Sequence, residues 1–149
     1  MDGRDAPLVF ISYQDSEARQ YALSAKSLIE SKGFRAWVWH CDRKSAGYVL
    51  DEIMDAIEES SFFLYIATKS SEKSRGQGFE RRYAWDQGRD PAFVLAFSED
   101  YISREHRVEI WNIVTEATFA EVCEKVAAEL PKYRLVETEV TVIQEGESL

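Results

Sequence analysis

The sequence predicts an α/β domain in which a central parallel sheet of five strands lies between two layers of helices. Short apolar runs alternate along the chain with segments whose apolar residues recur at helical spacing, which is the pattern of repeated strand and helix units. The runs at 62–67 and 92–97 are apolar throughout, as expected of strands covered on both faces. With 149 residues, 45% of them hydrophobic and 30% charged, the chain has the size and composition of one globular domain.

The first half of the chain predicts two strands and two helices. Residues 8–13 form an apolar run that indicates the first strand. Alanines then recur at helical spacing, with Asp15 placed to cap the helix and Gly33 to end it. The second strand is predicted at 34–39, and a helix follows the polar stretch at 40–47. The apolar residues along one face of this second helix are Val49, Ile53 and Ile57.

The second half continues the alternation. Residues 62–67 and 92–97 predict the third and fourth strands, joined by a polar loop at 68–78 and a short helix at 79–88. Beyond the fourth strand the apolar pattern weakens, and 108–114 is the candidate for the fifth strand. The sequence therefore predicts a flavodoxin-like three-layer sandwich with five parallel strands.

A last amphipathic helix is predicted from Phe119 to Leu130, where Pro131 is placed to close it. From 135 to 142 apolar residues alternate with polar or exposed ones, which predicts an extra strand that joins the sheet or pairs two chains. The expected organisation is a short tail at 1–7, the domain at 8–131, and an extension at 132–149 that contains this strand.

The predicted fold indicates where a binding site lies. Ligands of such sheets bind beyond the carboxyl ends of the strands, near the point where the strand order reverses. The loops that begin there follow Tyr13, Trp39 and Ala67. We therefore expect these three loops to form the site.

Charge and composition exclude several classes of function. The chain carries 18 Lys and Arg against 27 Asp and Glu, and a net charge of -9 argues against nucleic acid as a partner. No apolar run approaches the ~20 residues of a membrane-spanning helix. The first residues lack a secretory signal, and two cysteines, Cys41 and Cys123, are too few for a disulfide framework. We expect a cytoplasmic protein with no membrane partner.

Four motifs occur in order between Leu8 and Leu130. The first two are the run at 9–13 and Gly33-Phe34 leading to Trp37. The third is Gly47, Ile53, Ala56-Ile57 and Ser60. The fourth is Ser74, Glu80 six residues later, and Ala84. In this order and spacing the four motifs resemble those of the Toll/interleukin-receptor (TIR) domain family.

The resemblance implies an activity. Many TIR domains, including stand-alone prokaryotic ones, cleave NAD between nicotinamide and ribose, using the glutamate that corresponds to Glu80. The products are nicotinamide and either ADP-ribose or a cyclic isomer that serves as a signal in antiviral defence, so NAD is a substrate and no cofactor is implied. The resemblance also implies a homo-oligomer formed by TIR–TIR contacts through the loop at 40–47. This chain departs from the family at Trp39, where many members carry an acid, and at Gly76-Gln77, which replaces a Trp-Cys pair.

This chemistry is physically plausible with a single carboxylate. Ordinary glycosidases use two carboxyl groups, one of which protonates the leaving oxygen. Nicotinamide on NAD is a cationic leaving group and departs without that proton. Glu80 alone could orient the ribose hydroxyls and stabilise an oxocarbenium-like transition state.

A local basic patch is expected to hold the diphosphate of the dinucleotide. The stretch 69–82 has five Lys and Arg against two Glu, which gives it a formal charge of +3. Aromatic rings near the strand ends could stack on nicotinamide or adenine. The candidate substrate-binding residues are Ser12, Tyr13, Trp39, Arg43, Lys44, Tyr48, Ser74 and Arg75. Without the family resemblance, solvated surface or core packing is the more common explanation for residues of these types.

Other functions lack the residues that they need, with one exception. No metal site is expected, because His40, Cys41, His106 and Cys123 do not have ligand spacing. Gly76-Gln77-Gly78 lacks the third glycine of a hydride-transfer fold, and the third strand ends without the aspartate of a phospho-acceptor domain. The alternative that stays open is a non-catalytic TIR module that recruits other TIR domains, since Glu80 is necessary for activity but not sufficient.

Overall fold

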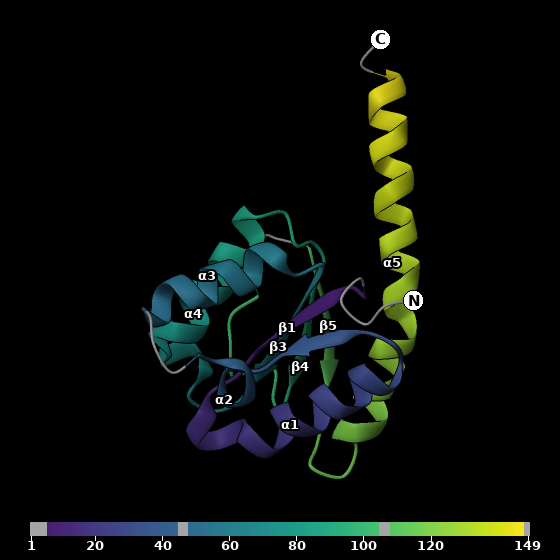
Figure 1. The fold of residues 1–149 in the computed structure, drawn as a ribbon. Coiled ribbons are helices and arrows are strands. Elements are labelled where there is room, and N and C mark those ends of the chain that lie inside the picture. The colour runs from purple at the N-terminus through teal and green to yellow at the C-terminus, as the bar shows by residue number, and fades with distance from the viewer. Residues whose placement is uncertain (1–5, 45–47, 105–107, 148–149) are drawn as a thin grey trace.

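A five-stranded sheet forms the centre of this computed structural model, in the order β2-β1-β3-β4-β5 (Figure 1). All neighbouring strands are parallel, and the predicted flavodoxin-like α/β fold is confirmed. The structure describes residues 6–44, 48–104 and 108–147, and after Tyr133 it describes the backbone alone. The strands are β1 (Leu8–Ser12), β2 (Arg35–Trp37), β3 (Phe62–Ala67), β4 (Ala92–Ala96) and β5 (Glu109–Ile113).

Helices cover both faces of the sheet. One buried cluster joins α1 and α5 to one face, and a second joins α3 and α4 to the other (Figure 1). A 3-10 turn at Ser71–Lys73 precedes α4. The helices are α1 (Asp15–Ser31), α2 (Trp39–Asp42), α3 (Val49–Glu59), α4 (Arg75–Asp86) and α5 (Phe119–Glu147).

Side chains of the central strands alternate between the two clusters. In β1, Phe10 packs with α3 and α4, whereas Val9 and Ile11 pack with α1 and α5. Every residue of β1 and β3 is buried. The strands are apolar throughout because neither face of the sheet meets water, and this is the reason the sequence predicted them correctly.

The strand order places the reversal point between β1 and β3. The chain passes from β1 through α1 to β2 on one side, and then to β3 on the other side of β1. The two strands are paired along their length, with Ser12 opposite Tyr65 near their carboxyl ends. A crevice for a ligand is therefore expected beyond Ser12, between the loops that leave these strands.

Helix α4 begins earlier than the sequence predicted. Its first residue is Arg75 rather than Phe79, because Ser74 acts as the N-cap and its hydroxyl accepts a 3.1 Å hydrogen bond from the Gln77 N–H. The predicted polar loop at 68–78 is thus part turn and part helix. As a result Glu80 lies in the second turn of α4, where its position is fixed by the helix.

The C-terminal extension is helical, so the predicted strand at 135–142 is wrong. Helix α5 continues through Pro131 to Glu147 and runs away from the body of the domain (Figure 1). A strand there would need a partner for its backbone groups, whereas an existing helix extends by satisfying its own. One proline removes a single hydrogen bond and is insufficient to end this helix.

Of the two signals predicted for the ends of α1, one is confirmed and the other is shifted by one residue. Gly33 ends α1 as predicted, with a φ of 90° that favours glycine. The N-cap of α1 is Gln14 rather than Asp15, which is the first helical residue and pairs with Arg19 one turn later. Gly47 of the third motif lies outside the described residues. Within the described part of the chain, no helix is both long and apolar enough to span a bilayer.

Candidate active site

Ser12 and Glu80 meet at the reversal point of the sheet. Ser12 is the last residue of β1, and its hydroxyl donates a 2.6 Å hydrogen bond to Glu80 Oε1 on α4. Ser12 is 1% exposed and Glu80 is 9% exposed. A carboxyl group is therefore buried at the place where sheets of this topology bind ligands.

Burial alters the acidity of Glu80. Loss of water around the carboxylate raises the pKa of Glu80 to about 7, and the hydrogen bond from Ser12 opposes this rise. Near neutral pH the side chain is thus divided between its neutral and ionised forms. A buried carboxylate with one hydrogen-bond donor can stabilise a positive charge brought close to it, because little water is present to screen the interaction.

A cavity of about 280 Å³ opens beside Glu80. Its aromatic side comes from β2 and α2, where the rings of Trp37 and Trp39 have centroids 6.1 Å apart. Phe10 stacks on Trp37 at 5.1 Å and continues this side into the core. The lining residues are Phe10, Ile11, Tyr13, Gln14, Asp15, Trp37, Trp39, Val49, Ile53, Ser74, Gly76, Gln77 and Glu80.

Five of the nine candidate residues come together here. Glu80, Tyr13, Trp39 and Ser74 line the cavity, and Ser12 bonds to Glu80 behind it. Ser12 and Tyr13 lie at the end of β1, Trp39 begins α2, and Ser74 and Glu80 belong to the first turns of α4. All five lie at or after strand ends or at the start of the helix after β3, as the fold predicts.

The other four candidates do not line the cavity. The guanidinium of Arg43 lies 5.4 Å from the centre of the Trp39 ring and is exposed. Lys44 lines a separate hollow with acidic residues, and its backbone N–H donates to Glu52 at 2.7 Å. Tyr48 is 79% exposed and Arg75 is the exposed first residue of α4. Their direct contact with a ligand in this cavity was predicted from sequence neighbourhood, and the structure gives it no support.

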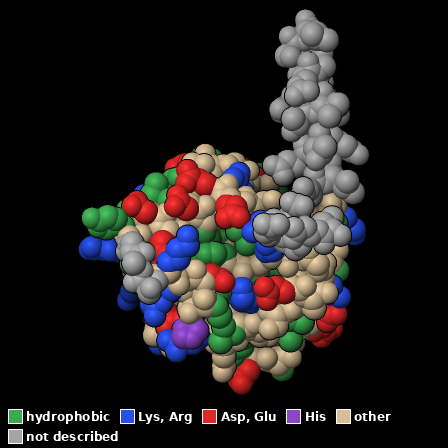
Figure 2. All heavy atoms as spheres, in the orientation of Figure 1, with side chains coloured by type: hydrophobic (Ala, Val, Ile, Leu, Met, Phe, Trp, Pro, Cys, Tyr) green, Lys and Arg blue, Asp and Glu red, His purple; other side chains and the backbone are tan. Residues whose placement is uncertain are grey.

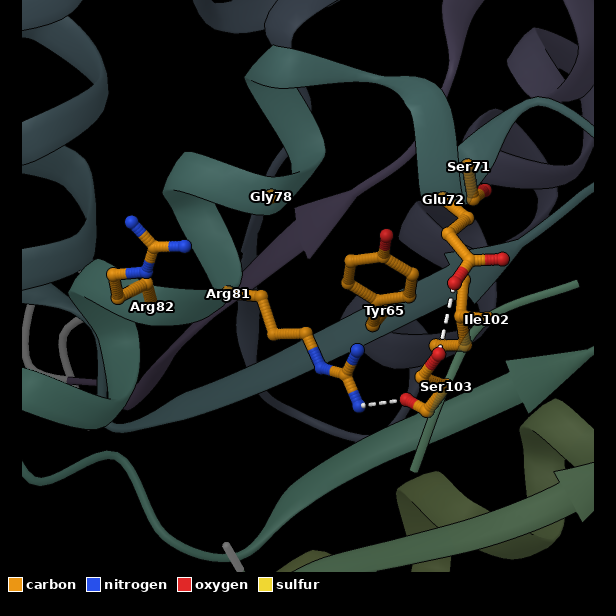
Figure 3. Close-up of a pocket in the computed structure, with 8 residues that line it drawn as sticks. All are labelled: Tyr65, Ser71, Glu72, Gly78, Arg81, Arg82, Ile102 and Ser103. Carbon is orange, nitrogen blue, oxygen red and sulfur yellow. Dashed lines mark hydrogen bonds between the residues drawn. The ribbon is translucent and has the colours of Figure 1, made fainter. Parts of the chain in front are cut away.

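One of the five cations of the expected basic patch, Arg81, is held in an ion pair. Arg81 is buried and forms an ion pair with Glu109 at 2.6 Å, so its charge is balanced within the protein. Figure 3 shows the Arg81 side chain leaving α4 toward Tyr65 and Ser103, and its guanidinium also donates to Ser103 O at 3.0 Å. Arg81 faces a second cavity, which has a volume of about 230 Å³. Its lining residues are Tyr65, Ser71, Glu72, Gly78, Arg81, Arg82, Ile102 and Ser103.

The distribution of charge on the surface is uneven. Figure 2 shows Lys and Arg side chains beside the histidine near α2, whereas acidic side chains gather over α3. An anionic ligand would therefore meet positive charge on the α2 side of this face. The domain as a whole carries a net charge of -9.

Sequence reasoning missed several lining residues. Trp37 and Gln77 are the most informative, because Trp37 ends β2 and Gln77 precedes Glu80 by three residues on the same helix face. The strand-end rule does point to Trp37, although the candidate set named from the sequence includes only Tyr13, Trp39 and Tyr48 among the aromatic residues. Gln77 could have been found only with the correct start of α4. No three His, Cys, Asp or Glu gather to hold a metal ion among the residues that the structure describes, and His106 lies outside them.

Comparison with known proteins agrees with this fold. A sequence model of the TIR domain family matches residues 9–121. The TIR-STING receptor from C. gigas, solved in complex with 2',3'-cGAMP, superposes with a TM-score of 0.65 at 17% identity over 80% of this chain. This chain spans 38% of that receptor's length. No curated protein sequence matches the chain.

Two other solved structures are similar. The TIR domains of the activated Roq1 resistosome, which recognises the pathogen effector XopQ, give a TM-score of 0.54 at 17% identity, covering 93% of this chain and 78% of theirs. A diflavin flavoprotein from Nostoc sp. gives 0.51 at 12% identity, covering 86% and 92%. At such identities these likenesses establish the fold, and the match over 9–121 establishes the family. The chain belongs to the TIR domain family.

Proposed function

We propose that this domain cleaves NAD at the bond between nicotinamide and ribose, releasing nicotinamide and either ADP-ribose or a cyclic ADP-ribose isomer as a defence signal. The observation that carries the proposal is the buried Glu80, bonded to Ser12 at 2.6 Å and open to a cavity with an aromatic side. Membership of the TIR family supports the same activity.

The reaction needs one negative charge and little else from the protein. The bond between ribose C1' and the ring nitrogen breaks heterolytically, and its electron pair neutralises the positive charge of the nicotinamide ring. The ribose is left as an oxocarbenium ion, which the ionised Glu80 stabilises. Water then adds to C1' and loses a proton to give ADP-ribose, or an atom of the adenine base adds instead and closes the cyclic isomer.

The raised pKa of Glu80 suits this role. In the free protein, burial holds the pKa of Glu80 near 7, so ionisation is incomplete at neutral pH. A cationic nicotinamide ring in the cavity favours the ionised form and lowers this pKa. Binding of substrate therefore generates the charge that the transition state requires.

The aromatic side of the cavity offers a surface for a planar ring. Trp37 and Trp39 are tilted by 53° to one another, and Tyr13 comes from the loop after β1. A cationic ring is attracted to the electron-rich face of an indole. We expect nicotinamide to bind against Trp39, with the ribose directed to Glu80.

Incubation of the purified protein with NAD, followed by chromatography of the products, tests the proposal. Nicotinamide release is expected, and Glu80→Gln is expected to reduce it by at least about a hundredfold. Glu72→Gln makes the same exchange at an exposed position in the preceding turn and is expected to leave the rate unchanged. Release by Glu80→Gln at the wild-type rate would refute the assignment.

A second candidate function is a non-catalytic module that binds other TIR domains. Its support is an apolar surface at the start of α3, where Tyr48, Val49 and Leu50 are 79%, 54% and 52% exposed. Self-association through this surface is also compatible with catalysis. If the rate of nicotinamide release rises more than linearly with protein concentration, both catalysis and self-association are supported. Association without any release of nicotinamide would favour the non-catalytic module.

A further inference from the structure

Gln77 presents an unused hydrogen-bond acceptor beside the candidate catalytic residue. It lies on α4 three residues before Glu80, lines the same cavity, and is 1% exposed. Its amide nitrogen donates to Ile66 O at 3.0 Å, which fixes the orientation of the amide. Within the part of the chain that the structure describes, the amide oxygen Oε1 is buried and has no hydrogen-bond donor.

The start of the helix does not account for this side chain. Ser74 and Gln77 have the spacing of a capping box, in which the glutamine would reach back to the backbone N–H of the serine. Here that N–H donates to Ser71 O at 3.1 Å instead. The Gln77 side chain instead reaches β3, where it donates to Ile66 O, and its oxygen is left without a partner in a place where an unmet acceptor is costly.

We propose that Gln77 determines substrate specificity by accepting a hydrogen bond, through Oε1, from the carboxamide N–H of the nicotinamide ring. The inference rests on the proposed function. The oxidised nicotinamide ring carries no other N–H or O–H group, so the carboxamide is the donor that this leaving group can offer. Residues 77 and 80 are ~4.5 Å apart along the helix axis and share a face, so the two side chains can meet neighbouring parts of one ligand.

The hydrogen bond between the nicotinamide carboxamide and Gln77 contributes mainly to substrate binding. It forms to the cationic ring before the bond to ribose breaks, and the carboxamide is not at the reacting carbon. Substrate and transition state are therefore held about equally, and loss of the bond is expected to raise KM with a smaller effect on kcat. Gln77 stands where the resembling family motif has a cysteine, which is a weak acceptor, so the inference concerns this chain in particular.

A comparison of two substrates tests the inference. In 3-acetylpyridine adenine dinucleotide a methyl ketone replaces the carboxamide, so the N–H donor is absent. The ratio of kcat/KM for NAD to kcat/KM for this analogue is expected to fall about tenfold from wild type to Gln77→Met. The lost contact with Ile66 affects both substrates alike and cancels in the ratio.

Two further variants serve as a second test and as a control. Gln77→Cys introduces the residue of the family motif and provides a second removal of the acceptor if Gln77→Met is poorly folded. Gln87→Met makes the same exchange at the other end of α4, beyond the cavity, and is expected to keep the wild-type ratio. An unchanged ratio in both Gln77 variants would overturn the inference.

Binding measured by calorimetry in a Glu80→Gln background separates this inference from the proposed function. Preferential binding of NAD over the analogue, lost when Gln77→Met is added, supports the role of Gln77 even if the wild-type protein releases no nicotinamide. If NAD is cleaved but the ratio of kcat/KM for NAD to kcat/KM for the analogue is the same in every variant, the proposed function is retained and the role of Gln77 is rejected. Absence of binding by either dinucleotide would reject it as well.

Discussion

The hydroxyl of Tyr13 accepts a 3.0 Å hydrogen bond from the backbone N–H of His40. Tyr13 follows β1 and His40 belongs to α2, so this bond ties the helix that carries Trp39 to the carboxyl end of the central sheet. A second tie comes from α1, where the Lys26 ammonium contacts Asp42 at 3.0 Å. The aromatic side of the cavity therefore depends on contacts made outside the rings themselves.

Replacing Tyr13 by Phe removes the first tie and keeps the ring. We expect KM for NAD to rise about two- to tenfold with less change in kcat, because Trp39 is held less firmly while Glu80 is untouched. Burial raises the pKa of Tyr13 to about 12, so the effect should be the same at every pH well below that value. Tyr21→Phe, at a partly buried position of α1 that packs against the core, is the matched control for steady-state kinetics. Equal KM values in Tyr13→Phe and the wild type would contradict the prediction.

Replacing Ser12 by Ala changes the acidity of Glu80. The hydrogen bond from Ser12 lowers the pKa of Glu80, so its removal raises that pKa further above the wild-type value of about 7. Because ionised Glu80 is the proposed active form, the rising limb of kcat/KM against pH is expected to move to higher pH. At neutral pH the rate should fall roughly three- to tenfold. A limb that stays in place or moves to lower pH would show that Ser12 does not control this ionisation.

Replacing Glu80 by Gln should stabilise the domain in a pH-dependent way. The folded-state pKa of about 7 lies above the ordinary value of 4.5, so the folded protein binds the additional proton between these values. Below about pH 4.5 the Glu80 carboxyl is neutral in both the folded and the unfolded protein, so Glu80 contributes its full stability relative to Gln. This stability is lost as the pH rises through about 7, because the unfolded protein ionises first. The variant is therefore expected to gain about 3 kcal/mol over the wild type across this interval.

Urea unfolding of both proteins at acidic, neutral and alkaline pH measures this difference. Glu72→Gln, at an exposed position, is expected to show little pH-dependent gain. A Glu80→Gln advantage that is constant with pH would mean that Glu80 titrates normally in the folded protein.

Replacing Arg81 by Met should destabilise the domain. Arg81 and Glu109 are hydrogen-bonded at 2.7 and 2.6 Å, with side chains only 9% and 5% exposed. Removing the guanidinium leaves the Glu109 carboxylate buried without its countercharge, at a cost of about 3 kcal/mol in the free energy of unfolding. Arg82→Met, at the next and exposed position of α4, is expected to change stability by less than about 0.5 kcal/mol. Equal urea midpoints for the two variants would refute the prediction.

Local sequence patterns predicted most of the elements of this fold. The apolar run at 62–67 is β3, and the helical spacing after Asp15 is α1. The failures occurred where local signals competed. Pro131 and the alternation at 135–142 suggested a stop and a strand, but the helix begun at Phe119 continues through the proline, since each further residue adds a hydrogen bond within the helix. The early start of α4 was missed because the N-cap signal of Ser74 lies within a strongly polar stretch.

By itself the sequence determined the five strands and most of the helices, and therefore which loops follow the strand ends, because periodicity and end signals act over a few neighbouring residues. Only the tertiary structure decided which side chains meet. Ser12 and Glu80 are 68 residues apart in the chain and come within 2.6 Å because β1 lies beside β3 and α4, which follows β3, packs on one face of the sheet. The same packing turned Gln77 toward the cavity and Arg81 away from it, since the rotation of a helix about its axis is set by the core that it covers.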